Sequence, residues 1–503
     1  MIEMKKNVWS ILLLGVITFI LSSCSSGDDE PNKPSVDTKL TTKEYVPLTK
    51  GIIRNPGMGW TLYDAASVDE MADAGAYWAA QDQIARDYAS CFYLRWRWSD
   101  MEPEEGKYAW EYDANFKALI QGALDRGLRL SFRVFVNGRD NLRPATPQFV
   151  FDAGAEGYEV AGANGGTNLT PYPDDPIFQE KFTNFVKAFA QEFDDPNKVD
   201  YVDGYNLGWW GEGHNIKFKN VANMENTFKW IINLYGNSFK KVPLIITIDS
   251  QVGLSLEKTY AYEGQGYSPR RDGYASYWFP ESQKQLLRSF FPDRMVVAEA
   301  AYWGNNSITY ANNTDQLYSW NSWADYYKQV VSEALSTHAN YLDLRETVEA
   351  SRYVRLAKDQ VDLFIEKGGY RIYPQKVSYS ESVAANKNLE IEHSWENIAQ
   401  GVLPNNDRRW NFKYKVAFTL LNNQGTIVKK WISEKAEPSD WVNTGGATKY
   451  TESLSVSSVS SGTYKLALAI VDTTQGGNPA INLAVEQQLV VNGWLQIGNV
   501  EIE

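Results

Sequence analysis

Two glutamates stand beside clusters of aromatic residues, each near the end of an apolar, β-rich run. Glu212 lies in GWWGEGHN (208–215) and Glu299 lies in VVAEAAYWG (296–304). Burying a carboxylate is unfavourable unless it is paired with a cation or used in chemistry. Two such groups in one cleft suit cleavage of a glycosidic bond, in which one acid protonates the leaving oxygen and the other carboxylate attacks or stabilises the sugar carbon.

The elements around these glutamates alternate between strand-like and helical patterns from about residue 50 to 368. Apolar residues recur at intervals of three and four in the stretches that separate most of the strands. Eight expected strands, most of them separated by a helical stretch, predict an α/β fold, a (β/α)8 TIM barrel over 49–368. An open doubly wound sheet is the alternative, but no glycine-rich phosphate loop follows any strand. The expected strands are 57–64, 90–98, 128–136, 202–210, 243–249, 274–279, 294–303 and 339–345.

Barrel enzymes build their sites where the strands end, at the carboxyl face. Glu212 at the fourth strand and Glu299 at the seventh would therefore meet across one mouth. Each glutamate alone is also explained by a structural ion pair with an arginine of the second or third strand, Arg95, Arg97 or Arg133. Their joint placement favours the catalytic interpretation.

Other polar and aromatic residues near strand ends are candidates for substrate binding. Each is also explained by packing or local hydrogen bonding. The three histidines are scattered, so we expect no metal site, and no cofactor motif is present. The substrate-binding candidates are Trp60, Arg97, Asn137, Trp210, His214, Asp272, Tyr302 and Trp303.

The character of the chain changes at about residue 370. Runs that alternate apolar and polar residues follow one another without helices, separated by turn signals such as NNQG and QGGNP. This pattern predicts an antiparallel β-sandwich over 369–503. No exposed aromatic platform can be identified in it, so we expect the sandwich to pack against the barrel rather than to bind sugar.

The amino terminus has the pattern of an export signal. Two lysines precede an apolar run that ends in LSSC, so 1–23 are expected to be a signal peptide. The end of this run resembles the lipobox of bacterial lipoproteins, which implies a lipid on Cys24. The polar, acidic segment 24–48 reads as a flexible tether and resembles the surface-export signal of Bacteroidetes lipoproteins. That resemblance implies a location on the outer membrane; an uncleaved membrane anchor is the alternative.

The composition narrows the class of partner. The 503-residue chain is 43% hydrophobic and 14% aromatic and carries a net charge of −13. Nucleic-acid binding needs clustered lysine and arginine, so a nucleic-acid partner is not expected. An aromatic-rich chain that is not basic suits an oligo- or polysaccharide partner, although aromatic residues also fill large cores.

The segment YLRWRWSDMEPEEGKYAW (93–110) resembles the second-strand motif of clan-A glycoside hydrolases, in particular the β-galactosidase families 35 and 42. That resemblance implies that Glu212 is the acid/base and Glu299 the nucleophile of a retaining enzyme. IIRNPGMGW (52–60) and the C-terminal segments resemble Bacteroidetes lipoproteins that end in domain-of-unknown-function family 4832. One position departs from clan A, which has asparagine before the acid/base, where this chain has Gly211.

The combined hypothesis is a surface-anchored retaining glycoside hydrolase that cleaves a β-linked, galactose-containing glycan. It requires a raised pKa at Glu212, which the neighbouring Trp209 and Trp210 and an ionised Glu299 would provide. A non-catalytic glycan-binding lipoprotein on the same barrel is the alternative. A purely structural outer-membrane lipoprotein is a third interpretation.

Overall fold

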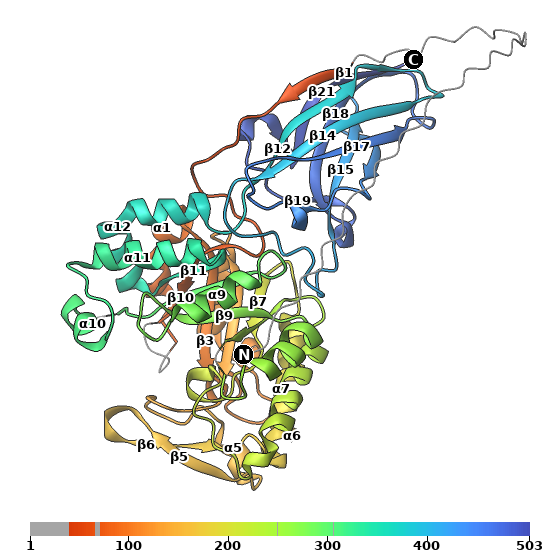
Figure 1. Cartoon of the computed structure of the whole chain (residues 1–503). Helices are drawn as coiled ribbons and strands as arrows, with labels where there is room; N and C mark the ends of the chain where they lie inside the picture. The colour runs from red at the N-terminus through yellow and green to blue at the C-terminus, as the bar shows by residue number, and fades with distance from the viewer. Residues whose placement is uncertain (1–39, 66–70, 249, 305) are drawn as a thin grey trace, which may run out of the picture. The chain divides into compact units, whose positions relative to one another are not determined.

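The computed structural model describes residues 40–65, 71–248, 250–304 and 306–503. Within these residues, eight parallel strands close into a barrel, and antiparallel sheets follow toward the carboxyl terminus (Figure 1). The predicted fold, a TIM barrel followed by an antiparallel β region, is confirmed.

The barrel strands lie in the closed order β10-β11-β2-β3-β4-β7-β8-β9, and every pairing is parallel. Their bounds are β2 (Gly59–Tyr63), β3 (Ala89–Arg97), β4 (Arg129–Phe135), β7 (Val199–Asp203), β8 (Leu244–Thr247), β9 (Ser268–Tyr274), β10 (Val296–Ala300) and β11 (Ala339–Arg345).

Two of the expected strands were placed wrongly. The fourth, expected over 202–210, ends at Asp203, so GWWGEGHN lies beyond the strand. The sixth, expected over 274–279, is Ser268–Tyr274 with the sequence SPRRDGY. Its inward side chains are charged rather than apolar, so the hydrophobic pattern gave no sign of a strand there.

The helices cover the outside of the barrel, and their apolar faces pack on it. In the longest helix of the first half, phenylalanines at positions 178, 182, 185, 189 and 193 form one buried stripe at helical spacing. Asp175 caps that helix by accepting hydrogen bonds from Ile177 N and Phe178 N. The longer helices are α1 (Ala74–Asp87), α4 (Ala114–Leu124), α6 (Pro176–Phe193), α7 (Met224–Ser238), α9 (Glu281–Ser289), α11 (Trp323–Ser336) and α12 (Thr347–Lys367).

Shorter elements fill the loops between strands and helices. They are α2 (Trp98–Met101), α3 (Ala109–Tyr112), α5 (Gln148–Asp152), α8 (Leu254–Leu256), α10 (Ile308–Thr314), a π-helical segment (Glu257–Gly264) and the hairpin of β5 (Gly157–Ala161) and β6 (Thr167–Pro171). Among the residues described between β8 and β9, no regular α-helix of ordinary length is present, and the sequence showed none there.

Two sheets with a shared hydrophobic core form the C-terminal region, as expected for a sandwich. One has the order β1-β12-β14-β17, with β1 (Leu40–Glu44), β12 (Ile372–Ser380), β14 (Asn388–Asn397) and β17 (Thr448–Ser455). The other has the order β13-β21-β18-β15-β16, with β13 (Ser382–Val383), β21 (Trp494–Ile502), β18 (Gly462–Asp472), β15 (Tyr414–Leu421) and β16 (Ile427–Ile432); β19 (Asn478–Ile481) and β20 (Val490–Val491) pair at its margin.

The end of the expected tether belongs to this region. Leu40–Glu44, assigned to the tether 24–48, forms β1 and pairs antiparallel with β12 along five residues. Backbone pairing to a sheet edge does not need an apolar sequence, which is why composition alone suggested a linker. Cys24 and the expected signal peptide lie outside the described residues. None of the described helices has the length and apolar character needed to cross a membrane.

Candidate active site

The segment that carries Glu212 is a tight turn beyond the end of β7. A 3₁₀ turn over Trp209–Gly211 precedes the glutamate. Gly211 has a φ of 80°, and a Cβ at this position would lie 3.1 Å from the Cβ of Phe135. A side chain at 211 would be strained and crowded. This geometry accounts for glycine where the resembled family has asparagine.

Asn206, the nearest preceding asparagine, does not replace the missing one. It is fully buried, and its amide donates to the backbone oxygen of Asp203 and to the hydroxyl of Tyr235, both at 2.7 Å. Tyr235 belongs to α7, so Asn206 joins the end of β7 to a covering helix.

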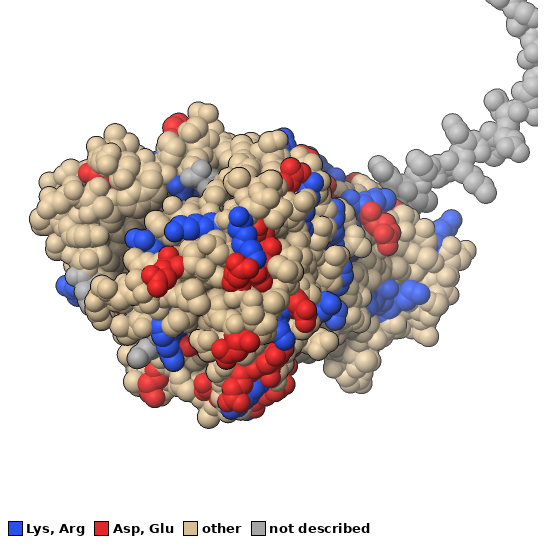
Figure 2. Space-filling model, turned by 90° about the horizontal axis from the view of Figure 1, so that it is seen from below, with Lys and Arg blue, Asp and Glu red and all other residues tan. Residues whose placement is uncertain are grey.

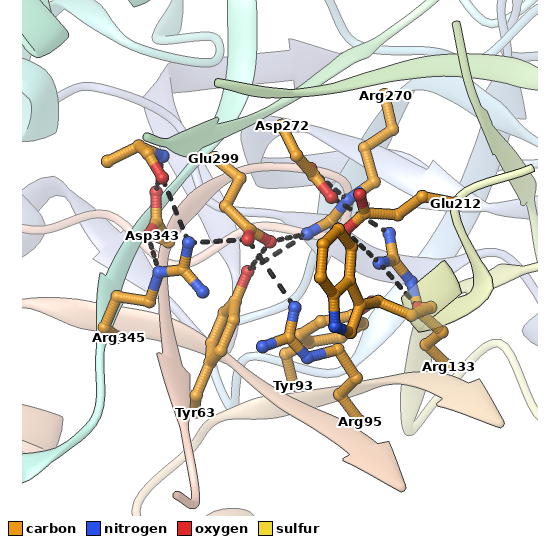
Figure 3. Close-up of polar contacts among 12 residues, drawn as sticks. Tyr63, Tyr93, Arg95, Arg133, Glu212, Arg270, Asp272, Glu299, Asp343 and Arg345 are labelled. Atoms are coloured by element: carbon orange, nitrogen blue, oxygen red, sulfur yellow. Dashed lines mark hydrogen bonds and ion pairs between the residues drawn. The ribbon is translucent and has the colours of Figure 1, made fainter. Parts of the chain in front are cut away.

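Like charges lie side by side within the barrel. Asp272 of β9 is the register partner of Glu299 of β10, and Arg95 of β3 is the register partner of Arg133 of β4. Register partners on parallel strands point to the same face. Arg270 joins the two carboxylates, because its Nε donates to Asp272 at 2.7 Å and its Nη2 donates to Glu299 (Figure 3).

Glu299 has donors at both carboxylate oxygens. Oε2 accepts from the Tyr63 hydroxyl at 2.6 Å and from Arg270, while Oε1 accepts from Arg345 Nη2 at 2.5 Å and lies 3.6 Å from Arg95 Nη1. Burial by itself would raise the pKa of Glu299. Arg345, with the other two arginines, outweighs that effect and holds the pKa below its ordinary value. Glu299 is therefore an ionised carboxylate.

Glu212 lies in the opposite electrostatic setting. Its Oε1 accepts from Arg133 Nη1 at 3.2 Å, its Oε2 lies 3.6 Å from His214 Nε2, and its side chain is 13% exposed. Burial raises the pKa of Glu212 to about 8, and the adjacent Asp272 carboxylate acts in the same direction while Arg133 opposes it. Glu212 is therefore a carboxylic acid at neutral pH.

Asp272 shares an arginine with each of the two glutamates, Arg133 with Glu212 and Arg270 with Glu299. It accepts from Arg133 Nη2 at 3.3 Å as well as from Arg270. Burial would raise its pKa, but the two arginines hold the pKa of Asp272 well below its ordinary value. Because Asp272 stays ionised, its charge keeps the proton on Glu212.

Backbone strain gathers at the loops and strand ends around this network. Asn206, Trp210, Ala275 and Arg345 have φ values of 60°, 53°, 57° and 63°. Non-glycine residues in this left-handed region cost free energy, and such positions cluster at functional sites.

Several of the candidates from the sequence lie in or beside this network. Besides Glu212, Glu299 and Asp272, His214 lies against Glu212. Trp210 accepts a hydrogen bond from Arg133 at its backbone oxygen, and the Trp303 ring lies 4.1 Å from the Arg345 guanidinium carbon. Trp210 and Trp303 are half-buried.

Four substrate-binding candidates have side chains that are buried against other parts of the chain, away from the position expected for them. Trp60 is fully buried under α12 and donates to Val361 O, and Arg97 is fully buried and pairs with Asp100. Asn137 is 1% exposed, and its amide points to the Tyr158 hydroxyl. The hydroxyl of Tyr302, which is 3% exposed, donates to Asp315. Sequence position near a strand end did not reveal which face each side chain occupies.

Sequence reasoning missed Tyr63, Arg270 and Arg345, which together hold Glu299. Their signal was present as a polar or charged residue within a barrel strand, in GWTLY, SPRRDGY and ANYLDLR. An arginine in a buried strand requires a carboxylate partner inside the barrel. Applied to Arg270 and Arg345, that rule would have directed attention to Glu299 from two further strands.

The described residues contain no group of three or more histidine, cysteine, aspartate or glutamate side chains arranged to hold a metal ion. On the face drawn in Figure 2, lysine and arginine side chains stand among aspartate and glutamate, and no broad basic surface is present there.

Comparison with known proteins gives structural matches alone. No protein-family model matches the chain, and no curated protein matches it. Similar solved structures include the catalytic domain of β-amylase from Paenibacillus polymyxa (6% identity, TM-score 0.40, 61% of this chain and 99% of that chain). Another is the glycoside hydrolase family 5 enzyme PbGH5A from Prevotella bryantii B14, in complex with a xyloglucan tetradecasaccharide (10%, 0.39, 63% and 99%). A third is endogalactoceramidase (11%, 0.40, 80% and 98%). At these values the likeness concerns the fold, and the function has to be argued from the site.

The protonation of Glu212 predicts a pH-dependent effect on stability. A carboxyl group whose pKa rises on folding takes up a proton as the chain folds. The free energy of unfolding therefore falls as pH rises from the ordinary value of 4.5 to about 8. Glu212→Gln removes this term. The variant should gain stability relative to the wild type across that range, with a slope of up to about 1.4 kcal/mol per pH unit. Urea unfolding followed by circular dichroism from pH 5 to 9 measures the difference.

The exposed Glu225, paired with Lys229 on α7, offers a matched glutamate-to-glutamine control. A stability difference between Glu212→Gln and the wild type that stays constant from pH 5 to 8 would contradict a protonated Glu212.

Proposed function

We propose that the protein is a retaining glycoside hydrolase that cleaves a β-linked glycan, with Glu212 as acid/base and Glu299 as nucleophile. One observation carries the proposal: two carboxyl groups of a single network are held in opposite protonation states. Pairs of titratable groups whose pKa values are driven apart identify the acid and the base of an active site.

In the first step, the Glu299 carboxylate attacks the anomeric carbon of the bound sugar. Protonated Glu212 gives its proton to the glycosidic oxygen, so that the bond to the leaving group breaks and a glycosyl ester forms on Glu299. Tyr63 and Arg345 fix the attacking carboxylate in place. Its carboxylate oxygens have about four acceptor positions, so hydrogen bonding leaves one for attack.

In the second step, Glu212 acts as the base. It has become a carboxylate, and it takes a proton from a water molecule that attacks the ester. The free sugar and the original protonation states are restored. Arg133 stabilises the charge on Glu212 between the two steps. His214, whose Nε2 lies 3.6 Å from Glu212 Oε2, is close enough to interact with the same charge.

The substrate side of the proposal rests on fewer residues. Trp210 and Trp303 offer aromatic surface for the apolar face of a sugar ring, and His214 offers a hydrogen-bonding group. A galactose-containing substrate is the choice that the sequence resemblance to families 35 and 42 favours.

A non-catalytic glycan-binding barrel is the second candidate. The observation in its favour is that Glu299 has contacts with three arginines and a tyrosine, and charge-assisted hydrogen bonds make a carboxylate a weaker nucleophile. The two candidates differ in whether reducing ends are released.

Replacement of either glutamate by glutamine should remove the activity. Glu212→Gln and Glu299→Gln should each lower kcat/KM by on the order of 10²–10⁴ or more, because proton transfer or covalent attack is lost. Release of reducing ends from a panel of β-linked plant and algal polysaccharides measures this, and NMR of the first anomer formed tests retention.

Glu225→Gln serves as the matched substitution and should retain the wild-type rate. Full activity in both active-site variants would contradict the assignment. A wild type that releases no sugar but binds polysaccharide would establish the second candidate.

Asp272 should set the alkaline limit of the reaction. Asp272→Asn removes the negative charge that raises the pKa of Glu212, so the acid should lose its proton at lower pH. In the wild type, kcat/KM should fall above pH of about 8, and in the variant this limb should move to lower pH. A pH–rate profile measures the shift.

Asp362→Asn on the exposed face of α12, where Asp362 pairs with Lys358, is the matched control. An alkaline limb that does not move in Asp272→Asn would show that another group sets it.

We further propose that the chain is a lipoprotein anchored to the outer membrane through Cys24. The support is the sequence pattern at 1–24 alone. Cys24→Ser should block incorporation of a labelled fatty acid and shift the protein from the membrane fraction to the soluble fraction. Labelling that persists in the variant would contradict the anchor.

A further inference from the structure

A cavity of about 540 Å³ lies on the C-terminal region, apart from the network in the barrel. It is formed by the turn between β15 and β16, the start of β18, and the strands β20 and β21. Its volume is within the range of roughly 300–1,000 Å³ typical of small-molecule sites.

The cavity has an apolar floor. Trp494 is 4% exposed and packs with Ala417, Ala467 and Ala469 on the face of the sheet that points away from the sandwich core. Small side chains on β15 and β18 leave room for the indole ring, and the ring still lines the cavity. Among the described residues, none accepts a hydrogen bond from the Trp494 indole N–H.

Side-chain amides surround this floor. Asn423, Gln424, Asn492, Gln496 and Asn499 line the cavity. The oxygen of the Gln496 amide accepts from Lys465 at 2.9 Å, which leaves its two N–H donors for a ligand. Amides donate and accept at once, as sugar hydroxyls do.

The walls are apolar or uncharged. Ile427 is 43% exposed and Val491 is 45% exposed, and both line the cavity beside Tyr464. Lys465 is the one charged residue among the described lining residues, and its ammonium group is bonded to Gln496. A cationic ligand would find no opposite charge to pair with and an anionic ligand only Lys465, whereas a neutral ligand with apolar and hydroxyl faces matches the rest of the lining.

We propose that this cavity is a second, non-catalytic binding site for a neutral oligosaccharide. One face of a sugar ring packs on the apolar floor and the Tyr464 wall, and its hydroxyls bond to the amides and to the Trp494 N–H. The sequence analysis expected only a packing role for the sandwich. The sequence pattern did not reveal this site, because Trp494 follows a turn and its side chain is recessed rather than exposed.

The cavity is independent of the catalytic proposal. The C-terminal region contacts the amino end of β11, where the Asn340 amide donates to Val402 O and Gly57 O. The glutamate network lies toward the carboxyl ends of the barrel strands, and its Arg345 is the last residue of β11. Occupation of the cavity therefore requires neither Glu212 nor Glu299, and its binding is measured without turnover.

Affinity electrophoresis of the full chain carrying Glu299→Gln, in gels that contain xyloglucan, galactomannan, mixed-linkage β-glucan or arabinogalactan, tests the proposal. At least one of these neutral polysaccharides should retard the protein. Gln496→Ala, Asn499→Ala and Trp494→Phe, each added to that chain, should weaken binding by about fivefold to tenfold through loss of one hydrogen bond. Trp494→Phe keeps the ring, so a folded protein is expected.

Asn443→Ala, an exposed asparagine outside the cavity, is the matched control and should bind as the parent does. Three results would overturn the proposal: no retardation by any neutral polysaccharide, retardation unchanged in all three cavity variants, or stronger retardation by polygalacturonate than by neutral polymers. Release of reducing ends by the wild-type chain is scored separately, so failure of the binding site and failure of the catalytic proposal are distinguishable.

Discussion

The charged layer inside the barrel is the constraint on which the site depends. Strand register places Asp272 beside Glu299 and Arg95 beside Arg133, so like charges would repel unless opposite charges lay close to them. Arg270 meets this requirement by bonding to both carboxylates. Buried charges are tolerated only with such partners and geometry. The network is thus required for the charged strands to pack in the closed barrel, whatever chemistry it also supports.

The difference between the two glutamates follows from where each is attached. Glu299 projects from a strand into the arginines and is held ionised. Glu212 stands on a turn beyond β7, where it meets one arginine, Arg133, and must share it with Asp272. A carboxyl with half a partner and a negative neighbour keeps its proton. Burial is the main cause of the raised pKa of Glu212, and the single shared arginine leaves that effect uncompensated.

The sequence revealed the fold better than it revealed the faces of the strands. Apolar runs and helical periodicity were enough for the barrel and the sandwich, because burial imposes those patterns along whole segments. Glu212 and Glu299 were chosen as candidates because each stands beside aromatic residues near an expected strand end. SPRRDGY was missed as a strand because its inward residues, Arg270 and Asp272, are charged. Trp60 was misassigned because a one-residue difference in a strand decides between core and mouth.

The glycine turn before Glu212 allows a close approach to the barrel and lacks the asparagine of the resembled family. Gly211 lets the turn pass 3.1 Å from Phe135 and so brings the acid to Arg133, but it removes the asparagine that would contact a sugar in the resembled family. In the proposed function, recognition of the sugar would then come from other groups near Glu212. His214, 3.6 Å from Glu212, and the half-buried Trp210 are carried by the same turn. In the proposed function, the acid and the recognition groups would therefore share one backbone segment, whose strained φ at Trp210 is retained because the surrounding contacts fix it.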